Sequence, residues 1–271
     1  MAERDYVLGT HDDEIDRLGL QHLVWRPWML DSWRRAGITR GSQVLDVGAG
    51  PGFATADLAE IVGASGEVLA LERSERFVAA ARRRCRERGL ENARIEEIDL
   101  MSDPIPATSF EAAWCRWVAC FVSSPTALVA AIGGALKPGG VVIFHEYGDY
   151  ASWRLMPPRP AVDRFVSAVM ASWRSAGGEP DIGLILPTLL RASGFQIRHV
   201  RPLVFAVRPT DFVWQWPSTF LKAGANRLQG LGQLSAADVE FLVREFDDAE
   251  HDLFTVMMTP LVLEIIADRS P

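Results

Sequence analysis

The sequence has few cysteines and no long apolar run. Its 271 residues include only 3 cysteines, Cys85, Cys115 and Cys120, and none has the Cys-x-x-Cys spacing of a zinc or redox site. No apolar run approaches the roughly 18 residues that cross a membrane. The first residues, Met1–Asp5, are polar and lack the apolar stretch of a secretory signal. We therefore expect free thiols, no metal site, no membrane contact and a cytoplasmic location.

Positive charge is also in short supply. The chain has 28 Lys and Arg against 35 Asp and Glu, which gives a formal net charge of −7. Proteins that bind a phosphate backbone usually present a basic surface, so this balance argues against a nucleic-acid partner. Hydrophobic residues make up 48% of the chain, as in ordinary globular proteins. The length fits one large domain, or one domain with a sizeable insertion.

Short apolar runs alternate with longer amphipathic segments in the first half of the chain, and the pattern predicts an α/β fold. Alternation of this kind is typical of a Rossmann-like, mostly parallel sheet with helices on both faces, whose strands end along one edge. Two later apolar runs bring the expected number of strands to seven. We expect strands at Gln43–Val47, Glu67–Glu72, Ala93–Ile98, Phe110–Arg116, Val141–Glu146, Phe195–Val207 and Pro260–Ala267, and helices at Phe53–Ile61, Arg76–Arg88, Ser124–Leu136, Ala161–Ala176 and Leu184–Ser193.

Helical and aromatic-rich segments flank this region. Residues 1–40 carry apolar side chains at helical spacing, interrupted by Pro27, and predict an N-terminal helical lid. Residues 41–271 would form the main domain, with insertions at about 147–194 and 209–253. Both insertions follow strands, so we expect them to fold over the strand ends as a helical cap around an acceptor pocket.

A glycine-rich turn follows the first expected strand. The segment 44–52 reads VLDVGAGPG, so Gly48, Gly50 and Gly52 lead from a buried strand into a helix. Glycine allows a sharp turn and close approach of a ligand, and the helix begins with unpaired amide donors. The third glycine lies four positions after the first, whereas a dinucleotide fingerprint has five. Taken alone, the glycines are also compatible with a tight turn that binds nothing.

The loop resembles motif I of the class I S-adenosylmethionine-dependent methyltransferases. In that family the loop surrounds the methionine and ribose part of the cofactor, and the turn Leu136–Gly140, LKPGG, also matches the family pattern. The resemblance covers about residues 41–146 and implies S-adenosylmethionine as the cofactor. It implies cofactor contacts for Asp46, Gly48, Ala49, Gly50 and Gly52.

Acidic residues end the next two strands. Glu72 lies 20 residues after Gly52, at the distance where a Rossmann acid meets ribose hydroxyls. The resemblance implies that Asp99 accepts a hydrogen bond from the adenine amino group and that the Leu100 amide binds a ring nitrogen. Arg73 stands where many relatives have an apolar residue against adenine, although arginine can also stack on a ring. A solvated strand-end acid remains the alternative for Glu72, and a loop acid for Asp99.

The ends of the fourth and fifth strands should face the acceptor. We expect Arg116 to contact the cofactor and Trp117 to contact the substrate. His145 is the candidate general base, since histidine titrates near neutral pH, and Glu146 is a candidate substrate contact. Structural packing is the alternative for His145 and Trp117. The same two interpretations apply to a possible lid of Gln21, His22 and Trp25, and to a possible apolar grip at Phe212–Phe220.

These features predict an enzyme that moves the methyl group of S-adenosylmethionine to a small, apolar or aromatic acceptor by in-line displacement. The alternative is a cofactor-binding protein of the same fold with a non-methylating role. A short-chain dehydrogenase would need Tyr-x-x-x-Lys, which none of the three tyrosines provides. The segment Cys115–Val118 replaces the Asn-Pro-Pro-Tyr of amino-group methyltransferases acting on nucleic acid, which favours a small molecule. Oxygen, nitrogen and carbon acceptors remain open.

Overall fold

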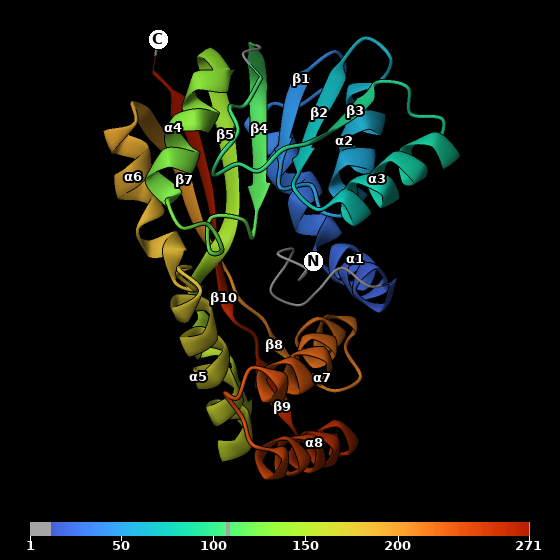
Figure 1. The fold of residues 1–271 in the computed structure, drawn as a ribbon, viewed down its shortest axis with the longest axis vertical. Helices are drawn as coiled ribbons and strands as arrows, with labels where there is room; N and C mark the ends of the chain where they lie inside the picture. The colour runs from blue at the N-terminus through green and yellow to red at the C-terminus, as the bar shows by residue number, and fades with distance from the viewer. Residues whose placement is uncertain (1–11, 107–108, 271) are drawn as a thin grey trace.

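A seven-stranded sheet forms the upper part of the molecule in Figure 1. The computed structural model describes residues 12–106 and 109–270. Strands β1 to β5 pair in parallel, and β10 runs antiparallel to both β5 and β7. The order is β3-β2-β1-β4-β5-β10-β7, which confirms the predicted Rossmann-like sheet. Its strands are β1 (Gln43–Val47), β2 (Glu67–Glu72), β3 (Ala93–Glu97), β4 (Phe110–Arg116), β5 (Leu136–Asp149), β7 (Phe195–Leu203) and β10 (Leu261–Arg269).

Strand β1 lies at the point where the strand order reverses. It pairs with β2 on one side and with β4 on the other. Val44–Val47 is entirely buried, as expected for a parallel strand that helices cover on both faces. Open α/β sheets bind ligands beyond the carboxyl ends of the strands at such a reversal. The topology therefore places a ligand site next to the glycine loop that follows β1.

The sheet is flanked by α2 (Phe53–Val62), α3 (Glu75–Glu87), α4 (Pro125–Ala135) and α6 (Leu186–Ala192), and also by α1, described below. Helix α3 shows how the sequence sets a helix start next to the ligand edge. The Ser74 Oγ accepts a hydrogen bond from the Phe77 N–H at 3.3 Å, which satisfies one of the unpaired amides of the first turn. Because Ser74 follows Glu72 by two residues, α3 begins directly at the end of β2.

Helix α1 (Asp12–Ala36) is one continuous helix that includes Pro27. The predicted interruption at Pro27 is therefore wrong: a proline inside a helix removes one hydrogen bond, but packing of the neighbouring side chains holds the helix together. Trp25, Met29 and Trp33 are buried, and the Trp33 ring lies edge-on to Trp114 of β4 at 5.4 Å. Residues 1–11 of the predicted lid lie outside the described residues. No helix in the described part of the chain is both long and apolar enough to span a membrane.

A buried polar cluster joins the second half of α1 to the sheet through hydrogen bonds. Glu264 of β10 is fully buried and accepts hydrogen bonds from Ser32 and Arg35 of α1, and from Arg201 of β7 at 2.9 Å. The His145 Nε2 lies 3.0 Å from the Ser32 Oγ and 3.3 Å from the Glu264 Oε2. Burial opposes ionisation of Glu264, but its hydrogen bonds from His145, Ser32 and Arg35 outweigh this and lower its pKa.

Most of the two predicted insertions forms a smaller lobe below the sheet in Figure 1, whereas α6 of the first insertion lies beside the sheet. Three helices, α5 (Pro160–Ser175), α7 (Gln215–Gly230) and α8 (Ala236–His251), accompany a second sheet of order β6-β9-β8. The expected strand Phe195–Val207 is thus divided between the two sheets, because the chain leaves the main sheet after Leu203. The remaining elements of this lobe and its connections are β6 (Arg154–Met156), β8 (Ala206–Val207), β9 (Val256–Met258) and three short 3₁₀ helices, η1 (Tyr150–Ser152), η2 (Ile182–Leu184) and η3 (Phe212–Trp214).

Candidate active site

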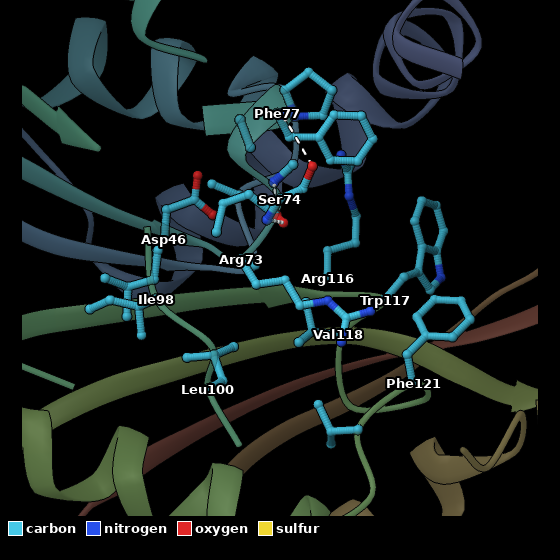
Figure 2. Close-up of a pocket in the computed structure, with 18 of the residues that line it drawn as sticks. Asp46, Arg73, Ser74, Phe77, Ile98, Leu100, Arg116, Trp117, Val118 and Phe121 are labelled. Carbon is cyan, nitrogen blue, oxygen red and sulfur yellow. Dashed lines mark hydrogen bonds between the residues drawn. The ribbon is translucent and has the colours of Figure 1, made fainter. Parts of the chain in front are cut away.

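A cavity of about 410 Å³ lies at the ligand edge of the sheet, around the glycine loop (Figure 2). In this view Ile98 and Leu100 lie on one side, and Trp117 and Phe121 lie on the other. Its size is within the range of about 300–1,000 Å³ that is common for small-molecule sites. All the residues predicted to bind the cofactor line this cavity except Gly52: Asp46, Gly48, Ala49, Gly50, Glu72, Arg73, Asp99, Leu100 and Arg116.

The three glycines of the loop all have positive φ but differ in what surrounds them. Their φ angles are 67° at Gly48, 55° at Gly50 and 79° at Gly52, a region that side chains disfavour. A Cβ at Gly48 would lie 2.2 Å from a methyl carbon of Val118, and one at Gly52 would lie 2.6 Å from the Ala81 Cβ. A Cβ at Gly50 would meet no atom within 4 Å. Gly50 therefore faces open space in the cavity. Gly52 instead lets α2 approach α3, which corrects its predicted contact with the cofactor.

Glu72 links the end of β2 to the glycine loop. Its Oε2 accepts a hydrogen bond from the Gly50 N–H at 2.8 Å, and its Oε1 accepts one from the Ser74 N–H at 2.9 Å. Burial raises the pKa of Glu72, and these amide donors partly oppose that rise. Each carboxylate oxygen has a second lone pair, so Glu72 can still accept hydrogen bonds from two hydroxyls in the cavity. The carboxylate is thus oriented before a ligand arrives.

Asp46 is the second carboxylate of the cavity, and it is almost fully buried. Its Oδ2 accepts a hydrogen bond from the Thr55 Oγ1 at 2.6 Å. Burial raises the pKa of Asp46 to about 6, although this hydrogen bond opposes the rise. A cation placed nearby would favour the ionised form. Asp46 therefore suits a ligand that brings a positively charged amine.

The loop after β3 gives one wall of the cavity. Ile98 and Leu100 provide apolar side chains there, and the loop between them is closed by Asp99. The Asp99 Oδ1 accepts a hydrogen bond from the Met101 N–H at 2.9 Å, and the Asp99 N–H donates to the Asp103 Oδ2 at the same distance. Apolar walls with backbone polar groups at their edge suit a flat heteroaromatic ring.

The turn after β4 gives the opposite wall. Trp117 has a positive φ of 51°, which is uncommon for a residue other than glycine. Its ring stacks between Tyr147 of β5 and Trp216 of α7, at centroid distances of 5.6 Å and 5.7 Å. The Arg116 guanidinium lies 5.1 Å from the centre of the Trp117 ring and contacts the Met29 sulfur of α1. A cation and a flat apolar surface therefore lie together at this end of the cavity.

His145 does not line the cavity. The side chain is fully buried between α1 and the sheet, within the Ser32 and Glu264 cluster. Burial lowers the pKa of His145, which keeps the ring neutral although Glu264 favours the charged form. An acceptor in the cavity cannot reach this ring. The structure thus corrects the predicted general-base role of His145.

Glu146 lies behind the wall that Trp117 forms. Its Oε1 accepts hydrogen bonds from the Val118 and Ala119 amides at 2.8 Å each, and its Oε2 accepts one from the Cys120 amide at 3.3 Å. Burial raises the pKa of Glu146 to about 7. The carboxylate is fully buried and does not line the cavity. The predicted substrate contact of Glu146 is therefore corrected to the stabilisation of the turn that carries Trp117.

Several lining residues come from segments to which the sequence assigned other roles. Leu18 and Gln21 reach the cavity from α1, whereas His22 and Trp25 do not line it. The insertions contribute Ala176 alone among the described lining residues, so they do not form the acceptor pocket as predicted. In the aromatic segment at 212–220, Phe212 is exposed, whereas the other aromatic side chains are buried and Trp216 stacks on Trp117. Helical spacing marked the apolar face of α1 but carried no signal for its position across the strand ends.

Comparison with known proteins identifies the family and its fold. Residues 44–140 match the methyltransferase domain family. The demethylmenaquinone methyltransferase of Geobacillus kaustophilus is 30% identical over 69% of this chain and 83% of its own length. The chain belongs to the class I S-adenosylmethionine-dependent methyltransferases. The methyltransferase therefore uses S-adenosylmethionine as its cofactor.

Two further proteins are similar to this methyltransferase. The demethylmenaquinone methyltransferase of Anoxybacillus flavithermus is 26% identical over 72% of this chain and 88% of its own length. The solved structure of phosphoethanolamine N-methyltransferase 2 from Haemonchus contortus has a TM-score of 0.56 at 16% identity, and the match covers 93% of this chain and 56% of that chain. At this identity the structural match shows a shared fold alone. The predictions of an enzyme and of its cofactor are confirmed.

Proposed function

We propose that this methyltransferase methylates a small, flat, aromatic acceptor that binds beside Trp117. The observation that carries the proposal is the arrangement of one cavity with two different ends. One end has the glycine loop and the two carboxylates of Asp46 and Glu72, and the other has the Trp117 ring, which stacks between Tyr147 and Trp216. When bound, S-adenosylmethionine supplies an electrophilic methyl group attached to a sulfonium.

The residues at the first end match the polar groups of the cofactor. Glu72 would accept hydrogen bonds from the ribose hydroxyls, and Asp46 would pair with the ammonium of the methionine part. Arg116 would pair with the carboxylate of the same part. Asp99 and the Leu100 amide would bind the edge of the adenine ring. The open space at Gly50 supports this assignment, because a side chain there would enter the cavity.

The residues at the second end orient the acceptor and exclude water. An acceptor ring that packs against the Trp117 wall is held in one orientation, and this alignment is what an in-line displacement requires. Trp117, Val118 and Phe121 line this end, so the transferred group would be shielded from solvent. The names of the relatives support an aromatic acceptor with ring oxygens, since demethylmenaquinone is a naphthoquinone.

A binding and turnover assay tests the proposal. The purified chain is titrated with S-adenosylhomocysteine by calorimetry, and then incubated with S-adenosylmethionine and naphthalene-1,4-diol under anaerobic conditions. We expect micromolar-range cofactor binding and a singly methylated product detected by mass spectrometry. Cofactor binding without methylation of this diol, or of a panel of phenols, would support the alternative of a non-methylating role.

A further inference from the structure

We propose that Gln21 determines acceptor specificity by donating a hydrogen bond from its side-chain amide to a ring oxygen of the acceptor. The inference deepens the proposed function and rests on it. Gln21 lies on α1, and its side chain lines the cavity although only 7% of the residue is exposed. Burial of an amide group in a mainly aromatic wall is unfavourable unless the amide forms a hydrogen bond with a polar partner.

The orientation of the Gln21 amide follows from its neighbour on the same helix. The Arg17 Nη1 donates a hydrogen bond to the Gln21 Oε1 at 3.1 Å. A guanidinium has donors only, so the amide oxygen must face Arg17 and the amide nitrogen must point the other way. Within residues 12–106 and 109–270, the Gln21 Nε2 has no hydrogen-bond acceptor, and Gln21 is one of the residues that line the cavity. Two N–H donors therefore remain for a ligand.

Arg17 is itself held in place from two directions. Its Nε and Nη2 donate to the two carboxylate oxygens of Glu14, each at 2.7 Å, and both residues are buried. A paired guanidinium and carboxylate is the most directional of the ion pairs in proteins. The Arg17 guanidinium also lies 5.6 Å from the centre of the Phe220 ring of α7. Glu14, Arg17 and Gln21 thus form a fixed row along one face of α1, and the smaller lobe contacts this row through Phe220.

The position of Gln21 on α1 assigns it to the acceptor end of the cavity. Residues four apart on a helix are neighbours, so Gln21 lies one turn before Trp25. The Trp25 ring contacts Trp117 edge-on at 5.3 Å. Gln21 therefore lies one helical turn from the residue that packs edge-on against the Trp117 wall. The polar groups of the cofactor are already matched by Asp46 and Glu72 at the other end, and by Arg116, which lies between Asp46 and Trp117.

This arrangement selects one class of acceptor. An N–H donor pairs with a lone pair on a phenolic, phenolate or carbonyl oxygen, and it repels a protonated amine. A flat ring packed against the Trp117 wall, with an oxygen directed at Gln21, satisfies both the wall and the amide. We infer that the acceptor is an oxygen-substituted aromatic compound, and that aromatic amines and hydrocarbons of the same size bind more weakly.

A matched pair of probes tests the inference. Naphthalene-1,4-diol and 1,4-dimethylnaphthalene have nearly the same shape, but only the first offers oxygen. Binding of each to the protein loaded with S-adenosylhomocysteine is measured by quenching of tryptophan fluorescence, without oxygen. We expect the diol to bind at least tenfold more tightly than the hydrocarbon. Gln21→Leu should weaken diol binding about tenfold, leave hydrocarbon binding unchanged, and leave the Kd of S-adenosylhomocysteine within twofold of the parent value.

Two further variants separate this role from a general effect on folding. Leu23→Ala lies on an exposed position of the same helix and should change none of the three affinities. Arg17→Lys offers a single ammonium in place of the guanidinium fork, so it should reduce the preference for the diol while Gln21 is still present. This second variant keeps the test informative if Gln21→Leu proves unstable.

The outcomes distinguish the inference from the function on which it rests. Equal binding of the two probes by the parent, or equal weakening of both by Gln21→Leu, would overturn the oxygen contact. A larger loss of S-adenosylhomocysteine binding than of diol binding would move Gln21 to the cofactor end and also overturn it. Failure of the proposed function would appear separately, as absence of methyl transfer by a parent protein that still prefers the diol.

Discussion

Asp46 and Glu72, two of the carboxylates that line the cavity, are oriented by hydroxyl and backbone donors before any ligand binds, and Glu72 gives the most direct test of this. Glu72→Ala should weaken binding of S-adenosylhomocysteine by about 1–3 kcal/mol, the scale of hydrogen bonds lost to a charged group. Calorimetry measures the change. Glu72→Gln is the control, since it keeps an oxygen for the Gly50 or Ser74 amide and should fold like the parent. Parent-like binding by both folded variants would mean that the ribose lies elsewhere.

The glycine loop offers a contrast between two neighbouring glycines. Gly50→Val points into open space, so it should fold with a modest loss from its positive φ yet abolish measurable cofactor binding. Gly48→Ala would place a carbon 2.2 Å from a Val118 methyl, so its main effect should be on folding. Thermal unfolding and calorimetry together separate the two effects. Normal cofactor binding by Gly50→Val would exclude Gly50 from the cofactor site.

Asp46 should make cofactor binding depend on pH. Its pKa is raised to about 6 in the free protein, chiefly by burial, so the Asp46 carboxyl group is protonated in most molecules below that pH. Only the ionised form can pair with the ammonium of S-adenosylhomocysteine, so affinity should fall as the pH drops through about 6. We expect about tenfold weaker binding at pH 5 than at pH 7.5, with proton release on binding near pH 6. Asp46→Asn should bind weakly with no such dependence, and an identical pH profile in this variant would assign the effect to another group.

Most residues that line the cavity around the glycine loop could be predicted from the sequence because they follow strands at fixed intervals. A parallel sheet brings those strand ends to one edge, so the order of Asp46, Glu72 and Asp99 along the chain already implied one site. Gly52 was predicted wrongly because a glycine serves equally for ligand approach and for helix packing. At Gly52 the glycine allows close packing against Ala81 of another helix. The spacing of residues within the loop does not reveal this contact.

At the scale of elements, the turn after β4 depends on a buried carboxylate of β5. Glu146→Gln should destabilise the protein by about 1–3 kcal/mol, because an amide group would place a donor against one of the three backbone donors at 118–120. Urea unfolding measures the loss, and circular dichroism confirms the fold. Unchanged stability would show that the turn holds without this carboxylate.

Glu146 should also make the stability of the protein depend on pH. Its pKa is about 7 in the folded protein, raised by burial above the ordinary value of 4.5. The folded state therefore binds this proton more tightly than the unfolded state. Protonated Glu146 thus contributes to the free energy of unfolding below about pH 4.5, and this contribution is lost as the pH rises through 7. The stability advantage of the parent over Glu146→Gln should shrink between pH 5 and pH 8. An advantage that grows over this range would contradict the assignment.

The alternation of strands and helices predicted the sheet because each apolar run was long enough for one buried strand. The face of the sheet toward which each strand-end side chain points could not be predicted in the same way. Successive strand residues point to opposite faces, so His145 and Glu146 had to be divided between two environments. The sequence did not reveal that helix α1 covers one of those faces and the turn at 117–120 covers the other. Both titratable side chains were therefore expected at the cavity, and both lie behind its walls.

At the scale of the whole molecule, the smaller lobe contacts the cavity wall from outside. Trp216 of α7 stacks on Trp117, and Phe220 of the same helix lies over Arg17. The sequence predicted that both insertions follow strands. Their relation to the cavity could not be predicted, because α1 comes from the opposite end of the chain and lies across the strand ends. Contacts between segments so distant in sequence leave no local pattern.

This arrangement makes an acceptor bound on Trp117 detectable in the smaller lobe. Hydrogen exchange is followed for the free protein, with S-adenosylhomocysteine, and with S-adenosylhomocysteine plus naphthalene-1,4-diol. We expect the cofactor product alone to slow exchange at 48–52 and 71–74, where backbone amides line or support its end of the cavity. Addition of the diol should extend protection to 117–121 and to 214–221 in α7, because a ring held on Trp117 restrains the indole stack that includes Trp216.

The control for this experiment is a segment of the same lobe that lies away from the stack. Helix α8 does not line the cavity, so exchange in Ala236–His251 should be the same in all three states. Trp216→Leu should keep the cofactor-dependent protection but reduce the protection that the diol adds in α7, since the aromatic contact with Trp117 is lost. If the diol slows exchange only at 48–74, the acceptor binds at the cofactor end and the smaller lobe has a structural role alone. Equal protection throughout α5, α7 and α8 would instead indicate closure of the whole lobe on binding.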